Sequence, residues 1–386
     1  MSTYDFLSSN PILDFGNFLI CFFCTIICTK YFQLKKIHFY FLSFHSILPF
    51  FINDFFMDYA YMPDQTRYIF YTDFFRYITE QKSINYGITI NDEFFFSKTG
   101  FASYLLSLIP TPNVLTTRSL GFANKVLFII LFSYLYKKKI FTNFTAYFFL
   151  AYPSFALYSG IALKEMLSVF FMFLIIERSY NFKLKQIPLL AFLFLACTLI
   201  KYQFTIFIAP ISVLLIVNPF DFKNKGYNFF IYFVCIILIL CIGFLLFNKF
   251  EESINSMRYS FFIDNGNTAE DFIYLKNFFD FFILSFVELF KSFIEPLPSF
   301  NKNIYNNIQF LENIIIVVII ICVTYISMKS NYRKAPIWIF FLLFSLTMTA
   351  VIVDNIGTLS RYKFPIILTY VIFISYNDKN ARTKKN

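Results

Sequence analysis

The sequence predicts an all-α polytopic membrane protein, a single integral membrane domain over residues 1–386 that crosses a bilayer about eleven times. Three observations predict this class. Apolar residues make up 58% of the chain, and its mean hydropathy is strongly positive. Charged residues make up only 15%, so one water-soluble core cannot hide this much apolar surface. Apolar runs of about 17 to 25 residues, the length that spans a bilayer as a helix, recur along the chain.

Eleven apolar runs meet this length requirement closely enough to be expected spans. The sixth run is short and could form a hairpin with the seventh around Lys201, an alternative that changes the count by one. The expected spans are 11–29, 37–53, 119–136, 140–158, 161–177, 187–200, 203–218, 228–248, 311–328, 336–353 and 362–376.

The distribution of lysine and arginine predicts the orientation. Cytoplasmic loops retain positive charge, and more than half of the 33 basic residues fall in six short connections on one side. The N-terminus is therefore expected outside and the C-terminus inside, with two long loops, 54–118 and 249–310, facing the periplasm or the cell exterior. The short connections hold Lys30, Lys35, Lys36, Lys137, Lys138, Lys139, Arg178, Lys183, Lys185, Lys223, Lys225, Lys329, Arg333, Lys334, Lys379, Arg382, Lys384 and Lys385.

Several classes of partner are not expected. The net charge of +10 is dispersed at membrane edges, which does not favour nucleic acid as a partner. All seven cysteines lie in apolar runs, where thiols behave as small hydrophobes. His38 and His45 share a helical face but have no cysteine or acidic neighbour at ligand spacing. No Gly-rich phosphate loop is present, and we expect neither a metal nor a cofactor. Met1 to Asn10 lacks the basic residues of a cleavable signal, so the first span should be retained.

The first long loop predicts an interfacial helix that begins near Asp64. Pro63 followed by an acidic residue is a helix-start signal, and aromatic and apolar residues then recur at helical spacing from Tyr68 to Ile78. In the alternative interpretation, Asp64 only caps the helix and Arg67 pairs with it. The polar face that we expect on the membrane surface holds Asp64, Arg67, Arg76 and Glu80.

Ionisable residues near the expected outer ends of the fifth, sixth and seventh spans are further candidates. Lys164 and Glu165 fall one turn inside an apolar segment, and Lys201 lies between two short spans. A charged side chain at membrane depth costs several kcal/mol unless it faces a partner or a cavity, so a functional role is the default interpretation. In the alternative, Lys164 extends to the surface and Glu165 is an ordinary ion-pair partner.

Two stretches near the end of the chain complete the expected outer face. The apolar run 279–294 carries Glu288 and Lys291 on one helical face, and it either dips into the outer leaflet as an interfacial helix or braces the loop. Arg361 precedes the last span. Its guanidinium group has the geometry to bind phosphate or carboxylate with two hydrogen bonds.

With this layout, the chain resembles the Wzy-type O-antigen and capsule repeat-unit polymerases, including their EpsG-like branch. The resemblance lies in about eleven spans with two large outer loops, and in three short segments. These are Pro63-Asp64-Gln65-Thr66-Arg67-Tyr68, Ser159-Gly160 followed by Lys164-Glu165, and Ser360-Arg361-Tyr362.

The resemblance implies an enzyme of the bacterial inner membrane that joins oligosaccharide repeat units carried on undecaprenyl diphosphate at the periplasmic face. Arg67 and Arg361 would bind the diphosphate or an acidic sugar, with positive potential added by Lys164 and Lys201. Asp64 or Glu165 would be the catalytic base. A chain-length regulator is a candidate partner, together with the lipid bilayer. Arg76, Arg118 and Arg258 complete the outer set of arginines.

Two alternatives stay open. The stretch Arg361-Tyr-Lys-Phe-Pro365 also looks like the end of glycosyltransferases of the GT-C class, which use polyprenyl-phosphate sugars, and Asp58 and Asp64 could then act as base. A flippase of lipid-linked sugars is the third possibility. Transporters usually show internal repeats and helices interrupted by glycine or proline, whereas glycine is rare here and no repeat is found.

Overall fold

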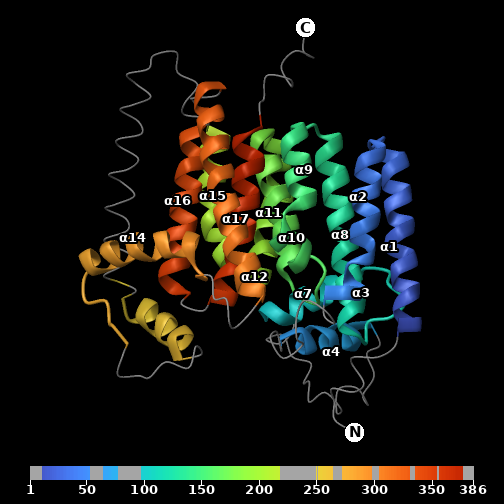
Figure 1. Ribbon diagram of the computed structural model, residues 1–386, viewed down its shortest axis with the longest axis horizontal. Coiled ribbons are helices and arrows are strands. Elements are labelled where there is room, and N and C mark those ends of the chain that lie inside the picture. The colour runs from blue at the N-terminus through green and yellow to red at the C-terminus, as the bar shows by residue number, and fades with distance from the viewer. Residues whose placement is uncertain are drawn as a thin grey trace. The chain divides into compact units, whose positions relative to one another are not determined.

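The structure is a computed structural model that describes residues 11–52, 64–76, 97–217, 249, 251–263, 272–297, 304–330, 335–353 and 356–376. Within these ranges, every regular element is a helix (Figure 1). The chain divides into two compact units, Met1–Ser212 and Val213–Asn386. Each unit is described by itself.

Five helices in the described residues are long and apolar enough to cross a membrane. These are Asp14–Phe32, Thr117–Lys137, Leu184–Ile216, Asn307–Ser330 and Ala335–Ile352. The expected sixth and seventh spans both fall in the third of these. The expected span 228–248 lies outside the described residues. The helices at the other expected spans are either too short or not apolar enough to be among these five.

Helix α8 (Thr117–Lys137) is the centre of the first unit. In the apolar stretch of α8 that is long enough to span a membrane, 78% of the residues are buried. In the corresponding stretch of α1 (Pro11–Phe32), only 22% are buried. Helices α1, α2 (Lys36–Ile47) and the short α3 (Pro49–Phe51) all pack against α8. A helix buried on all sides must be apolar all round or have its polar groups paired, and the contacts below show that α8 pairs them.

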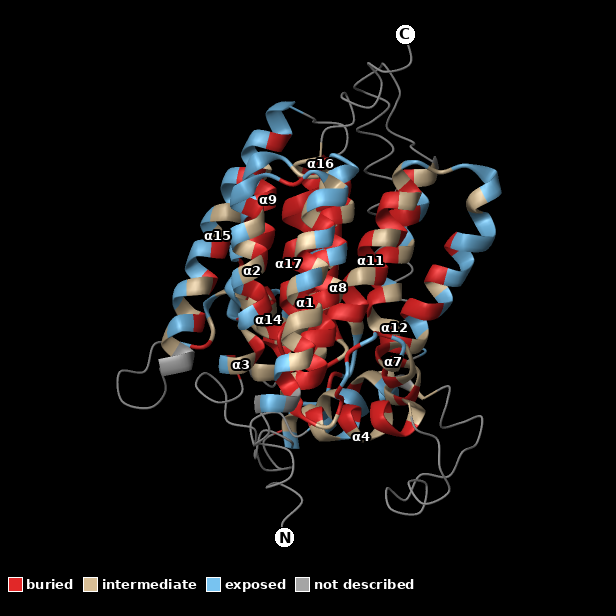
Figure 2. Cartoon of the chain, turned by 90° about the vertical axis from the view of Figure 1, so that its right-hand side faces the viewer, coloured by how far each residue is buried: buried red, intermediate tan, exposed pale blue. Residues whose placement is uncertain are grey.

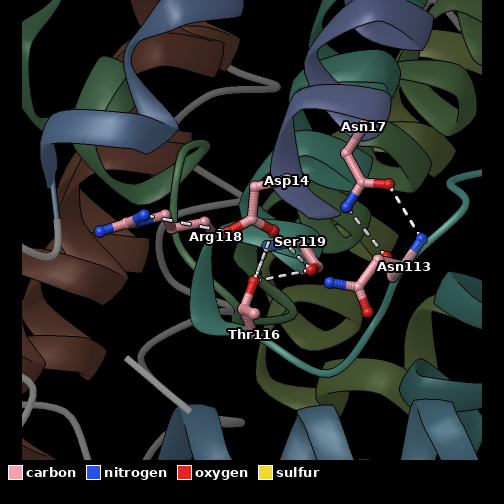
Figure 3. A network of polar contacts seen from close by, with 6 residues as sticks. All are labelled: Asp14, Asn17, Asn113, Thr116, Arg118 and Ser119. Carbon is pink, nitrogen blue, oxygen red and sulfur yellow. Dashed lines mark hydrogen bonds and ion pairs between the residues drawn. The ribbon is translucent and has the colours of Figure 1, made fainter. Parts of the chain in front are cut away.

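The N-terminal end of α1 is joined to the N-terminal end of α8 by a polar network (Figure 3). The buried Asp14 accepts hydrogen bonds from Thr116 Oγ1 at 2.6 Å and from Ser119 Oγ at 3.0 Å. Thr116 also caps α8 by accepting from the backbone N–H of Ser119. A carboxylate at a helix N-terminus is favoured by the helix dipole, so Asp14 stabilises both helices at their junction.

The chain then returns through α9 (Asn143–Ala151) and α10 (Pro153–Tyr158). Thr142 and Thr145 form a capping box at the start of α9, and Pro153 divides α9 from α10. A non-helical segment, 159–164, follows, and α11 (Glu165–Tyr180) begins directly after it.

Helix α12 (Ile187–Val217) follows the short η3 (Leu184–Gln186). It consists of two helical segments separated at Lys201, whose backbone is non-helical (φ −156°, ψ 86°). Thr198 Oγ1 donates to Thr205 Oγ1 at 3.1 Å. In an unbroken helix, residues seven apart are separated by about 10 Å along the axis. The chain therefore turns sharply at Lys201, the position where the sequence suggests a hairpin.

Helices α4 (Asp64–Arg76) and α7 (Lys98–Ser107) lie across one end of the first unit, which we call the α4 end (Figure 1). The sequence predicts a helix from near Asp64, and the structure describes a helix over Asp64–Arg76. Its apolar residues Tyr68, Ile69 and Phe74 are buried, and α4 packs against α7 and α8. The apolar face of α4 is thus covered by protein.

The second unit contains α14 (Phe278–Ile294), α15 (Ile304–Ser330), α16 (Ala335–Ile352) and α17 (Ile356–Ile374). Helix α14 lies across the others (Figure 1) and packs against α15 and α16. Exposed residues follow much of α15, whereas α17 is mostly buried (Figure 2). Phe278, Phe281 and Leu284 attach α14 to a small core around Leu275 and Val351.

Candidate functional site

The segment 159–164 at the α4 end is buried although it is not helical. Residues 158–163 are all buried. Buried backbone groups need hydrogen-bond partners, and side chains from two helices supply them. Asn124 Nδ2 of α8 donates to the carbonyl groups of Ile161 at 2.7 Å and of Leu163 at 2.8 Å. From the other side, Gln65 Oε1 of α4 accepts from the backbone N–H of Ala162 at 3.0 Å.

Lys125, the neighbour of Asn124 on α8, holds the start of the same segment. Its ammonium group donates to Ala156 O at 2.7 Å, to Ser159 Oγ at 2.8 Å and to His45 Nδ1 at 3.1 Å. The lysine side chain is fully buried. All three N–H groups therefore have neutral acceptors, and Lys125 forms no ion pair in the described part of the chain.

Two glycines allow α8 to approach the segment this closely. A Cβ atom on Gly121 would collide with the carbonyl group of Gly160. A Cβ atom on Gly160 would lie 3.2 Å from Lys125 Cε and would collide with the Ile52 side chain. The backbones are thus in contact where Asn124 and Lys125 bind the segment.

The segment ends at the candidate residues Lys164 and Glu165. Glu165 is buried, and its Oε1 lies 3.4 Å from Nζ of the equally buried Lys201, at the turn in α12. Lys164 is half-buried at the N-cap position of α11. The structure thus brings together three of the residues that the sequence singles out, and Glu165 pairs with Lys201.

Asp64 and Arg67 are exposed on α4, as expected for a polar face. Arg67 makes no hydrogen bond or ion pair with any residue that the structure describes. The alternative in which Arg67 pairs with Asp64 is therefore wrong, and the guanidinium group of Arg67 is available to an anion. Glu80 and Asp58, which the sequence also suggests, lie outside the described residues.

Three other arginines of the expected outer set are occupied by the fold. Arg76 donates to the carbonyl groups of Ser107, Ile109 and Thr111 after α7. Arg118 lies 4.0 Å from the carboxylate of Asp14 (Figure 3). In the second unit, Arg258 donates to the carbonyl groups of Val351 at 3.2 Å and Ile273 at 3.0 Å. Arg76 thus belongs to the interior side of α4 and not to its wet face.

Arg361, the remaining candidate, is half-buried on α17 in the second unit. Two residues further on, the buried Lys363 donates to Ser292 O and to Asn313 Oδ1, both at 2.8 Å. Lys363 therefore holds the end of α14 against α15 and α17. Arg361 itself stays a candidate for anion binding.

Asn124, Lys125 and Asp14 are residues that the sequence analysis missed. Each lies inside an expected span or at its edge, so the signal was present: a polar or ionisable residue in an apolar run needs a partner. The histidines also have roles that sequence does not predict. His45 Nε2 lies 2.7 Å from Leu150 O, which leaves Nδ1 to accept from Lys125, and His38 packs edge-on against Phe132 and Tyr136.

The comparisons with known proteins add no constraint on function. No protein-family model, no curated protein and no solved structure matches the chain.

Proposed function

We propose that this chain polymerises oligosaccharide repeat units carried on undecaprenyl diphosphate, as a membrane glycosyltransferase at the periplasmic face of a bacterial inner membrane. The observation that carries the proposal is the buried pair Glu165–Lys201, which lies 3.4 Å apart at the α4 end with Lys164 beside it. Charges of both signs at membrane depth suit a substrate with an anionic group and a reacting hydroxyl.

The proposal includes eleven spans, with the N-terminus outside, the C-terminus inside and the α4 end facing the periplasm. The positions of the basic residues support this orientation. Helices α8 and α11 both run away from the α4 end, and each has a basic residue in its last turn, Lys137 in α8 and Arg178 in α11. Arg118 in the first turn of α8 lies beside the carboxylate of Asp14. At that opposite end, Lys35 donates to Asn143 at the start of α9, and the ammonium group of Lys137 lies over the ring of Tyr31 in the last turn of α1. Positive charge at that end favours the cytoplasm.

In this mechanism, the diphosphate of the donor binds to the cationic residues of the α4 end. Arg67 is exposed with no partner in the described structure, and Lys164 and Lys201 add positive potential. A carboxylate, Glu165 or Asp64, accepts the proton of the acceptor sugar hydroxyl. The hydroxyl oxygen forms a bond to the anomeric carbon of the donor while the bond to the diphosphate breaks, and the diphosphate leaves with the electron pair. Arg361 would bind the diphosphate or an acidic sugar.

A flippase of lipid-linked oligosaccharide is the second candidate function. The observation in its favour is the turn at Lys201 within α12, since interrupted helices are frequent at the binding sites of transporters. The two functions differ in the product that accumulates when the protein fails. A strain that lacks a polymerase leaves single repeat units on the cell surface, whereas a strain that lacks a flippase leaves none.

The test uses a strain whose surface glycan depends on this chain, and it follows glycan length by gel electrophoresis. We expect Glu165→Ala and Arg67→Ala to abolish long polymer and to leave single units. Glu177→Gln is the matched control, because Glu177 is a buried carboxylate at the other end of the same helix, paired with Lys138 and Arg178. It should keep long polymer.

Membrane levels of each variant are measured by immunoblot. Long polymer in strains that carry normal amounts of alanine variants at Asp64, Lys164, Glu165 and Arg361 would contradict the site. Complete loss of surface glycan would instead support the flippase.

A further inference from the structure

Helix α14 has a wide apolar face that no part of the described protein covers. The seven residues on this face are large, and each is 41–67% exposed. They recur at the spacing of a single helical face. They are Phe279, Phe282, Ile283, Phe286, Val287, Phe290 and Ile294. We call this face the α14 stripe.

The exposed face of α14 contrasts with the covered face of α4. Both helices lie across the long helices of their own unit (Figure 1). The large apolar residues of α4 that define its inner face, such as Ile69 and Phe74, are buried by α7 and α8. The inner face of α14 is also packed, through Phe281 and the buried Ser285, yet the α14 stripe is left open on the other side.

The charged residues of α14 lie along one edge of the stripe. Asp280, Glu288 and Lys291 are at positions i, i+8 and i+11, so they share one side of the helix. Glu288 and Lys291 form an ion pair of 2.7 Å. A helix with an apolar face, a charged edge and a protein-packed side fits a boundary between hydrocarbon and water.

Two hydrogen bonds fix the level of α14 along the long helices of its unit. Lys363 of α17 donates to Ser292 O, and Asn313 of α15 donates to Glu295 O at 2.6 Å. The exposed apolar surface of α15 passes through this level, with Ile308, Leu311, Ile314, Ile315 and Val318. Helix α15 is one of the helices that can cross a membrane. The α14 stripe is therefore continuous with a surface that belongs in lipid.

We propose that α14 lies in the plane of the bilayer, with the α14 stripe inserted into the acyl chains of one leaflet and with Asp280, Glu288 and Lys291 at the headgroup level. The occupant is phospholipid hydrocarbon. Continuity with α15 favours lipid over a second copy of the chain, since a copy bound to the stripe would also have to cover the exposed apolar surface of α15. This inference does not depend on the proposed glycosyl transfer.

The test uses the single tryptophan of the chain, Trp338, which is fully buried and gives a constant background. Phe286→Trp and Phe290→Trp place a second tryptophan on the stripe of the full-length protein. Each variant is reconstituted in phosphatidylcholine vesicles with bromine atoms at acyl carbons 6 and 7, or at carbons 11 and 12. Quenching of tryptophan fluorescence by bromine requires contact with the labelled carbons.

The control is Phe281→Trp, on the packed side of α14. We expect bromine at carbons 6 and 7 to quench a tryptophan on the stripe at least about twofold more than it quenches the control. Interfacial helices insert their apolar face only about 5–10 Å below the headgroups, so the deeper bromines should quench less. Lys291→Trp, on the charged edge, should be quenched more by aqueous acrylamide than by bromine.

Equal quenching at the stripe and at Phe281→Trp would overturn the proposal. A second outcome would also overturn it: tryptophans on the stripe that neither bromine label quenches, in vesicles where cross-linking joins two copies of the protein through α14. Because tryptophan variants can misfold, photoreactive benzoylphenylalanine at Phe286 and Phe290 gives a second measurement. Adducts with phospholipid support the insertion, and adducts with protein alone contradict it. Neither readout requires glycan synthesis, so failure here leaves the proposed function untouched.

Discussion

Replacement of Asn124 by leucine tests whether side chains of α8 hold the buried segment 159–164. The two residues have similar volumes, so the main change is the loss of two hydrogen bonds of 2.7 and 2.8 Å to the carbonyl groups of Ile161 and Leu163. A buried group left without its partner costs about 1–3 kcal/mol. Ile161 O still accepts from the N–H of Leu163 at 2.9 Å, so the loss of its bond to Asn124 costs less than the loss at Leu163 O. We expect Asn124→Leu to lower the free energy of unfolding by roughly 2–4 kcal/mol.

Thermal unfolding in detergent provides the assay, in a protein whose Cys24, Cys235, Cys241 and Cys322 are replaced by serine. The remaining thiols of Cys21, Cys28 and Cys197 are buried and react with a fluorogenic maleimide only when the fold opens. Asn124→Leu should show this reaction at a lower temperature than the parent protein. Asn143→Leu, on the exposed start of α9, is the matched control and should unfold like the parent. An Asn124→Leu protein that unfolds at the parental temperature would refute the assigned role of Asn124.

Two further predictions concern close packing and the use of arginine. Gly121→Ala should destabilise the protein by about 1–3 kcal/mol, the range for overpacked cores, because its Cβ would collide with the backbone of Gly160. Gly16→Ala should be neutral or stabilising, because its Cβ would lie 3.4 Å from Pro112, an ordinary contact; the same thermal assay compares the two. Arg76→Ala should lower thermal stability, because carbonyl groups at the end of α7 and after it lose their donors. Arg67→Ala should unfold at the parental temperature. Equal unfolding temperatures for the two variants would contradict the assignment of Arg76 to the fold and of Arg67 to an open surface.

Local features of the fold are predictable from the sequence. The helix over Asp64–Arg76 follows from aromatic and apolar residues at helical spacing after an acidic residue, and the break in α12 follows from a lysine between two short apolar runs. The helix at 278–294 follows from its apolar periodicity. Each signal lies within a few residues of the feature that it predicts, and local spacing is what sequence patterns record.

The candidate site depends on contacts between distant positions, which the sequence does not contain. Glu165 and Lys201 are 36 residues apart, and their pairing depends on how α11 meets the turn of α12. Arg67 and Arg76 look alike in the sequence, yet only Arg76 points toward carbonyl groups of another helix. Which charge is available and which is occupied follows from tertiary packing alone.

The turn at Lys201 also bears on the surrounding lipid. The two halves of α12, 187–200 and 202–217, have lengths of about 21 and 24 Å at the usual helical rise, which is short of a hydrocarbon layer about 30 Å thick. Such hydrophobic mismatch is relieved by local thinning of the bilayer or by tilt of neighbouring elements. Phospholipids next to α12 should therefore be compressed, and this protein should prefer thin membranes over thick ones.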